Sequence, residues 1–197
     1  MISRLSSIIT EALCKSQVIE AADRELYVYG FFVLLSQGLF FLISALFGCI
    51  FGTLWESMVF YIMFSTLRCY AGGFHASKES VCTCCTTVAL FLASLSIWIL
   101  SAVESVIVPL CVLVLCGAVV YLLSPLDSED KPLTSDDFRE YRRKSRMIVI
   151  ILTAIAMSGV CIRLQGLLYA ASTSIVLEGC LLVLGKVQKR TTYHNHQ

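Results

Sequence analysis

Long apolar runs alternate with short polar segments along this chain. Six such runs can be read, at 31–52, 54–67, 86–103, 106–123, 147–162 and 164–185. A helix needs about 20 residues to cross the hydrocarbon core of a bilayer. The first and last runs reach this length, whereas the run 147–162 is marginal and the run 54–67 is short. The pattern predicts an all-α polytopic membrane protein with about six transmembrane helices.

The short run 54–67 leaves a second interpretation open. It can cross the bilayer obliquely, gain length from residues 70–73, or form a re-entrant element. The alternative to six spans is therefore four spans plus two shallow or re-entrant elements.

Residues 1–29 precede the first run and have a different pattern. Ile2, Leu5, Ile9 and Ala12 recur at steps of three and four. This spacing places them on one face of a helix. We therefore expect an amphipathic N-terminal helix, which either lies in the membrane interface or packs on the cytoplasmic face of the protein.

Composition supports the membrane interpretation. Hydrophobic residues make up 57% of the 197 residues and charged residues only 15%, against about 25% charged residues in typical soluble domains. The mean hydropathy is +0.81. These values exclude an ordinary soluble globule and a disordered chain. The net charge of +1 gives no electrostatic basis for binding nucleic acid, so we expect no such partner.

The distribution of Lys and Arg predicts the orientation, because cytoplasmic segments are enriched in basic residues. If the N-terminus is cytoplasmic and six spans follow, every one of the 15 basic residues except Arg163 lies in a cytoplasmic segment. Both termini and the segments 68–85 and 124–146 are then cytoplasmic.

The segment 124–146 is predicted to be a cytoplasmic loop with an acidic first half and a basic second half. Its basic half anchors the topology, and it can also form a docking surface. The candidate residues for binding an acidic peptide or anionic lipid headgroups are Arg142, Arg143 and Lys144.

Candidate chemistry is concentrated in the segment 68–85. This segment contains His75, the first histidine of the chain, followed by Cys82. A thiol nucleophile needs a base, but seven residues along a straight helix span about 10 Å, whereas a hydrogen-bonded pair needs about 3 Å. We therefore expect a turn, which Gly72 and Gly73 permit. We also expect Cys82 near a helix start, where the helix dipole favours a thiolate.

Taken alone, these residues leave three classes of protein open. The first is a cysteine hydrolase and the second is a small transporter. The third is a metal-binding protein with ligands from Cys69, His75, Cys82, Cys84 and Cys85. Zinc favours such ligands, although their spacing matches no common zinc finger.

The pattern Arg68-x₄-Gly73-x-His75-x₆-Cys82 resembles the signature of the AgrB family of bacterial membrane cysteine endopeptidases. The resemblance extends to the chain length, the apolar runs, the amphipathic N-terminus and a Ser124–Pro125 step before the basic segment. It implies that His75 is the catalytic base and Cys82 the nucleophile. Arg68 and Gly73 correspond to supporting positions.

The resemblance implies one AgrB-like membrane domain over residues 1–197, in a bacterial cell membrane and as a homodimer. The implied partner is an AgrD-like precursor peptide, from which the enzyme removes the C-terminal part. A thioester on Cys82 then closes to a cyclic thiolactone or lactone. No cofactor and no metal are expected. A non-enzymatic transporter or exporter subunit in contact with membrane lipid is the alternative.

Two neighbouring thiols compete with Cys82. On a helix, Cys84 faces away from Cys82, whereas Cys85 shares its face but lies almost a turn further toward the apolar run. We expect Cys85 to be buried and therefore unreactive. Elsewhere in the spans, Glu178 is expected to form a protein-facing hydrogen bond, because intramembrane carboxylates are costly.

Overall fold

A computed structural model of the chain describes residues 2–73, 79–126 and 135–195. Within this part of the chain the secondary structure is helical, apart from one isolated bridge between Gly72 and Leu126. The seven α-helices are α1 (Ile2–Lys15), α2 (Arg24–Phe51), α3 (Leu54–Ala71), α4 (Glu79–Val103), α5 (Ile107–Leu123), α6 (Ser135–Cys161) and α7 (Gln165–Asn195). Each of the six apolar runs coincides with one of them. The predicted all-α class is confirmed.

Several helices have the length and composition of membrane spans. Helices α2, α4, α6 and α7 are long and apolar enough to cross a bilayer, and α5 is apolar but shorter, at 17 residues. Their outward faces expose large apolar side chains, such as Leu42 and Ile50 of α2 and Val114 of α5. Lipid tails are suitable neighbours for such faces, whereas water is not. The chain is a multi-pass membrane protein.

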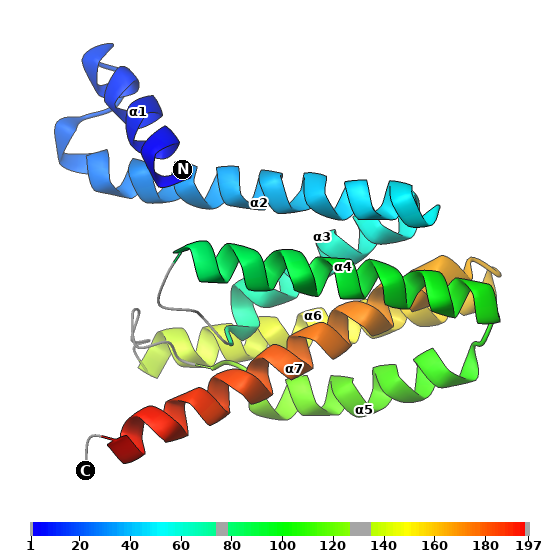
Figure 1. The fold of residues 1–197 in the computed structure, drawn as a ribbon. Coiled ribbons are helices and arrows are strands. Elements are labelled where there is room, and N and C mark those ends of the chain that lie inside the picture. Colours follow the sequence, from blue (N-terminus) through cyan, green and yellow to red (C-terminus); the bar gives the residue numbers. More distant parts are fainter. Residues whose placement is uncertain (1, 74–78, 127–134, 196–197) are drawn as a thin grey trace. The chain divides into compact units, whose positions relative to one another are not determined.

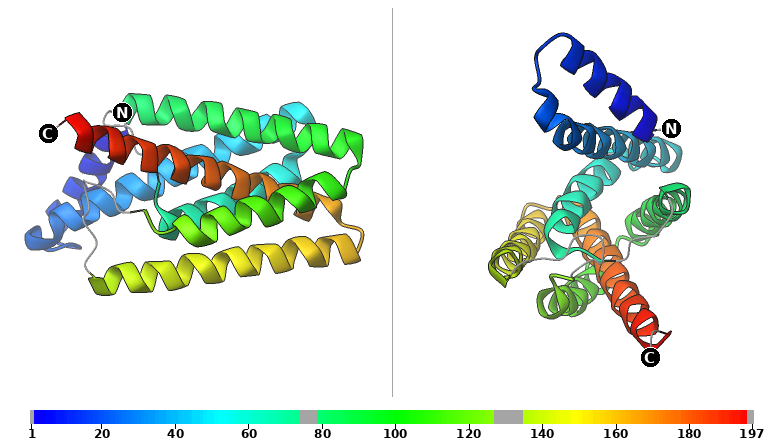
Figure 2. Two further views of the ribbon diagram at one scale, coloured as in Figure 1. Left: turned by 90° about the horizontal axis from the view of Figure 1, so that it is seen from below. Right: turned by 90° about the vertical axis from the view of Figure 1, so that its left-hand side faces the viewer.

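Helix α3 covers the short apolar run at 54–67. The helix continues to Ala71 and reaches 18 residues, which corresponds to about 27 Å at 1.5 Å per residue. It runs obliquely between the two ends of the helices around it (Figures 1 and 2). Helix α3 is continuous over these residues, but it is not among the helices that are long and apolar enough to cross a bilayer. Both interpretations of the run 54–67 therefore stay predictions.

The chain divides into two compact units, Met1–Ile43 and Ser44–Gln197. In the first unit α1 packs on the beginning of α2 through small hydroxyl side chains, Ser6 and Thr10, which are buried and donate to carbonyls of α1 itself. Leu5 and Ile8 are exposed. Of the predicted apolar stripe, Leu5 and Ala12 are exposed, whereas Ile2 and Ile9 are half-buried. The choice between an interfacial helix and one packed on the protein stays a prediction.

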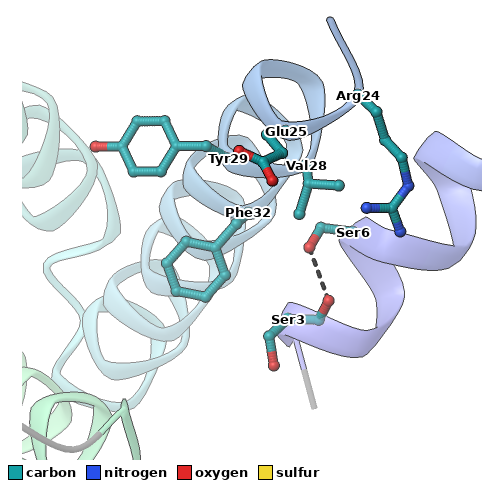
Figure 3. A pocket seen from close by; sticks show the side chains of 7 residues that line it. All are labelled: Ser3, Ser6, Arg24, Glu25, Val28, Tyr29 and Phe32. Atoms are coloured by element: carbon teal, nitrogen blue, oxygen red, sulfur yellow. Dashed lines mark hydrogen bonds between the residues drawn. The ribbon is translucent and has the colours of Figure 1, made fainter. Parts of the chain in front are cut away.

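A pocket of about 260 Å³ lies between α1 and the start of α2. Figure 3 shows Arg24 and Val28 pointing from α2 toward α1. The lining is completed by Ser3, Ser6, Glu25, Tyr29 and Phe32.

The second unit is organised around α7, which contacts α3, α4, α5 and α6. Leu168, Ile175 and Leu182 are fully buried and recur every seven residues along α7. Between them lie small buried residues, including Ala170 and Ala171. Small side chains let neighbouring helices approach closely in a membrane. Helix α7 is therefore the core of this unit.

Helices α3 to α7 run alternately between the two ends of the second unit (Figure 1). One end, called the motif end here, contains residues 71–73 and 124–126 together with the starts of α4 and α6. The opposite end contains residues 104–106 and 162–164. The segments that the basic residues predict to be cytoplasmic thus meet at the motif end, whereas Arg163 lies at the other.

The predicted loop 124–146 is helical in its second half, because α6 begins at Ser135. Two acidic residues, Asp136 and Asp137, occupy the first turn, where they interact favourably with the helix dipole. Glu140 and Lys144 form an ion pair four residues apart, with 2.6 Å between Oε1 and Nζ. The basic residues are therefore displayed on helical turns. Residues 127–134, including the acidic half of the segment, lie outside the described residues.

The shared motif end leads to a topological prediction. In intact cells a membrane-impermeant maleimide should label a cysteine introduced at Ser105 or Arg163, in a background that lacks the native cysteines. It should not label a cysteine retained at position 82, which becomes accessible after permeabilisation. External labelling of position 82 would show that the orientation is reversed.

Candidate active site

The site begins where α3 ends. Gly72 caps α3 with φ 73°, and Gly73 follows with φ 126°. Leu126 N–H donates to the carbonyl of Ala71 at 2.9 Å, and a Cβ on Gly72 would collide with the carbonyl of Leu126. The glycine turn that the sequence predicts is present. It depends on Leu126, which comes from a distant part of the chain.

Arg68 holds this turn from the side of α3. Its Nη1 donates to the carbonyl oxygen of Gly72 at 2.5 Å. The same guanidinium lies where a side chain on Gly73 would have to be, and the carbonyl of Leu181 is 3.3 Å from that position. Gly73 is thus enclosed by an arginine of α3 and by the backbone of α7. This contact explains why a residue without a side chain occupies the position.

The sequence did not predict the partner of Arg68, which is Glu178 of α7. Oε1 of Glu178 lies 3.7 Å from Nη1 of Arg68, and the glutamate side chain is fully buried. Neither carboxylate oxygen has a hydrogen-bond partner among the described residues. Removing one member of a buried ion pair destabilises a protein by about 3–5 kcal/mol. The only sequence signal was a carboxylate within an apolar run.

Residues 124–126 are held against α6. Ser124 and Ser145 form a buried hydrogen bond between their hydroxyl groups at 2.8 Å. Nε of Arg146 donates to the carbonyl of Tyr121 at 3.3 Å, and its guanidinium lies over the Tyr121 ring. Helix α6 therefore supports the strand-like contact that closes the glycine turn.

The basic candidates differ in their surroundings. Lys144 lies over the ring of Tyr70 on α3, 5.4 Å from its centroid, and Tyr70 also contacts the ring of Tyr141. By contrast, Arg142 and Arg143 are exposed. Lys144 is engaged in holding α6 against α3, whereas the two arginines are available to a ligand at the motif end.

Cys82 is the fourth residue of α4 and is half-buried. Its position agrees with the prediction of a helix start, since α4 begins at Glu79. Cys84 and Cys85 are both exposed. The expectation that Cys85 is buried is wrong, because its side chain is exposed on the surface of α4. Burial therefore does not distinguish Cys85 from a reactive thiol.

His75 lies outside the described residues, so its position relative to Cys82 stays a prediction. All ten cysteines are free thiols. Within residues 2–73, 79–126 and 135–195, no three His, Cys, Asp or Glu side chains are grouped so that they could hold a metal ion. The metal alternative includes His75, which lies outside these residues.

One protein family and two individual proteins are similar to this chain in sequence. The family described as AgrB, accessory gene regulator B, matches residues 6–183. Two AgrB-like proteins of Clostridium perfringens, one from strain SM101 and one from strain 13, are each 25% identical to the chain over 158 residues. The alignment covers 77% of this chain and 73% of each relative. No solved structure matches the chain.

The enclosure of Gly73 can be tested by substitution. Gly73→Ala should abolish the activity of the protein, because the new Cβ displaces Arg68 and any L residue at this φ is strained by about 1–3 kcal/mol. Gly52→Ala is the matched control, since Gly52 also has a positive φ of 70° but has open space around it.

The measurement compares activity per inserted protein with thermal stability for both variants. We expect a larger loss of stability in the Gly73 variant, because displacing Arg68 also disturbs its ion pair with Glu178. Activity per folded protein should be lost in the Gly73 variant alone. Equal activities would show that the contact with Arg68 has no functional role.

Proposed function

The chain belongs to the AgrB family, and we propose that it is a membrane cysteine endopeptidase that removes the C-terminal part of an AgrD-like precursor peptide. Family membership implies a role in the processing of quorum-sensing peptides and an association with such a precursor. The cysteine chemistry and the identity of the residues that perform it are the proposal.

The observation that carries this proposal is the position of Cys82. It lies in the first turn of α4 at the motif end, while Arg68 and the glycine turn lie at the end of α3. Helices α3 and α4 contact each other, and only residues 72–78 connect them. His75 is on that short connection. Amide N–H groups at a helix N-terminus favour an anionic sulfur.

In the first step the Cys82 thiolate attacks the scissile carbonyl of the precursor. His75 accepts the thiol proton and then donates it to the leaving amine. The amide bond breaks, the C-terminal part leaves with a free amino group, and the N-terminal part remains on Cys82 as a thioester. Backbone N–H groups at the start of α4 are suitable donors for the oxyanion.

In the second step a thiol or hydroxyl of the precursor attacks the thioester. A new thioester or ester closes the ring, and the Cys82 thiol is regenerated. Exchange between two thioesters is nearly balanced, whereas the first step is uphill, so removal of a product must drive the pathway. Water must also be excluded, because hydrolysis would otherwise compete with ring closure. A thiol that is half-buried at the edge of a membrane domain meets this requirement.

The exposed Arg142 and Arg143 give the motif end a surface for an acidic part of the precursor. They project from the first turns of α6, and α6 is attached to α3 through Tyr70 and Lys144. A peptide bound to these arginines would therefore lie at the same end of the unit as Cys82. Exposed charges act mainly on encounter and weak binding, and salt screens them.

Substitution of the thiols tests the nucleophile. Cys82→Ala should abolish cleavage of a co-expressed precursor, and His75→Ala should reduce it nearly as much, because the thiolate loses its base. Cys84→Ala and Cys85→Ala are the matched controls and should remain active. The readouts are precursor cleavage and, by mass spectrometry, the residue that carries the covalent peptide adduct.

An adduct on Cys84 or Cys85 would assign the nucleophile to another sulfur. Full cleavage by the Cys82→Ala protein without an adduct on any other thiol would refute the cysteine mechanism. Cleavage of the precursor in cells that lack the protein would favour a transporter or exporter role.

The double variant Arg142→Gln, Arg143→Gln tests the docking surface. It should raise KM for the precursor at least severalfold and leave kcat unchanged, and raising the ionic strength should produce the same change in the wild-type protein. Lys186→Gln with Lys189→Gln removes the same charge from α7 at the same end of the unit and serves as the control for a general effect of charge. A fall in kcat at constant KM would place the two arginines in the catalytic apparatus instead.

A further inference from the structure

The chemistry proposed for Cys82 and His75 leaves one buried charge unused. Glu178 has no exposed side-chain surface and lies within the apolar core helix α7. A carboxylate at this depth is expensive unless a partner compensates it. The ion pair that the structure shows for it is with Arg68, at 3.7 Å. Its retention in the core therefore calls for a role that an apolar residue could not perform.

The pair connects the core to the glycine turn through a short series of contacts. Glu178 faces the guanidinium of Arg68, and Arg68 donates to the carbonyl of Gly72. The same guanidinium lies against Gly73. One helical turn beyond Glu178, the carbonyl of Leu181 also faces Gly73. Helix α7 thus contacts the turn directly through Leu181 and indirectly through Arg68.

The contacts of Arg68 restrict its conformational freedom, and this restriction affects the site. Arginine has a long side chain with several rotamers, and ordering it costs conformational entropy. An anion on one side of the guanidinium removes that freedom and leaves another N–H aimed at the Gly72 carbonyl. His75 follows Gly73 by two residues. The turn is therefore the described backbone that directly precedes the segment with the proposed base.

We propose that Glu178 is a positioning residue, which orients the Arg68 guanidinium on the Gly72–Gly73 turn, the last described backbone before the proposed base His75. The proposal rests on the proposed function, because it assigns the base and the nucleophile as above. Glu178 itself touches no substrate. Its carboxylate acts through Arg68, from the core helix that also supports the other helices of the unit.

A simple structural role makes a different prediction. If the pair served only to join α3 to α7, its loss would lower the amount or the stability of the protein and leave the correctly folded fraction fully active. If Glu178 positions the turn, the folded fraction itself must lose reactivity. Misplacing a catalytic group by about 1 Å can cost on the order of a hundredfold in rate.

The test uses the full chain in membranes, with Cys84 and Cys85 replaced by alanine. Iodoacetamide is the probe, and its rate of reaction with Cys82 is followed from pH 5 to pH 10 by peptide mass spectrometry. Glu178→Gln should slow alkylation near pH 7 at least about tenfold, because an unassisted thiol is mostly protonated there. With precursor as substrate, kcat should fall while KM is maintained. Glu178→Asp should recover part of both values.

Two controls separate the positioning effect from general damage. Glu56→Gln removes the other carboxylate that lies within an apolar run of the second unit. Glu56 packs over Gly166 at the opposite end, and the variant should leave the alkylation profile unchanged. The effects of Arg68→Gln and Glu178→Gln on the alkylation rate of Cys82 should also be non-additive. The double variant should be no less reactive than the Arg68→Gln protein, since both changes remove the same contact.

A normal alkylation profile and a normal kcat in folded Glu178→Gln protein would overturn the proposal. If that variant fails to insert, Arg68→Met with Glu178→Leu replaces the pair by apolar side chains, which buried pairs often tolerate. Loss of Cys82 reactivity in this folded protein supports the proposal, and normal reactivity refutes it. If Cys82→Ala is inactive while Glu178→Gln is normal, only the positioning role fails. Cleavage by Cys82→Ala would refute the proposed function itself.

Discussion

The ion pair between Arg68 and Glu178 is the interaction on which the motif end depends. A glutamate without exposed surface in the central helix needs a cation, and Arg68 supplies one from the last turns of α3. Because α7 packs against four other helices, this carboxylate has little freedom to move. The arginine is therefore held by a rigid element, and the glycine turn is held by the arginine. The compensation of the buried Glu178 charge and the geometry of the glycine turn therefore depend on the same arginine.

Segments far apart in sequence complete this arrangement. Leu126 bonds the end of α3, Ser124 is joined to Ser145 of α6, and Lys144 lies over Tyr70. Each contact is small, but together they fix three chain segments at one end of the bundle. The glycine turn at the end of α3 is then supported on the sides of α6 and α7. Such support is what the proposed role of the following segment in catalysis requires.

The arrangement suits a reaction that must avoid water. Cys82 is half-buried in the first turn of a membrane-spanning helix, and the exposed arginines lie on α6 at the same end of the unit. In the proposed function, a precursor is held by its charged part at the aqueous surface while its scissile bond reaches the half-buried thiol. Membership of the AgrB family and this division of roles are mutually consistent.

The sequence by itself determined the helical membrane class, the number and approximate limits of the apolar helices, and the motif from Arg68 to Cys82. These follow from local properties, because a bilayer demands long apolar helices and because glycines permit positive φ. Local pattern also placed Cys82 near a helix start. It wrongly predicted that Cys85 is buried and that the basic half of the segment 124–146 is a loop. The exposure of a side chain and the limits of a helix depend on neighbouring elements as well as on local sequence. Only the tertiary structure paired Arg68 with Glu178, Leu126 with the glycine turn, and Lys144 with Tyr70. Each of these contacts joins residues more than 50 positions apart, and no periodicity in a sequence records which distant side chains packing brings together.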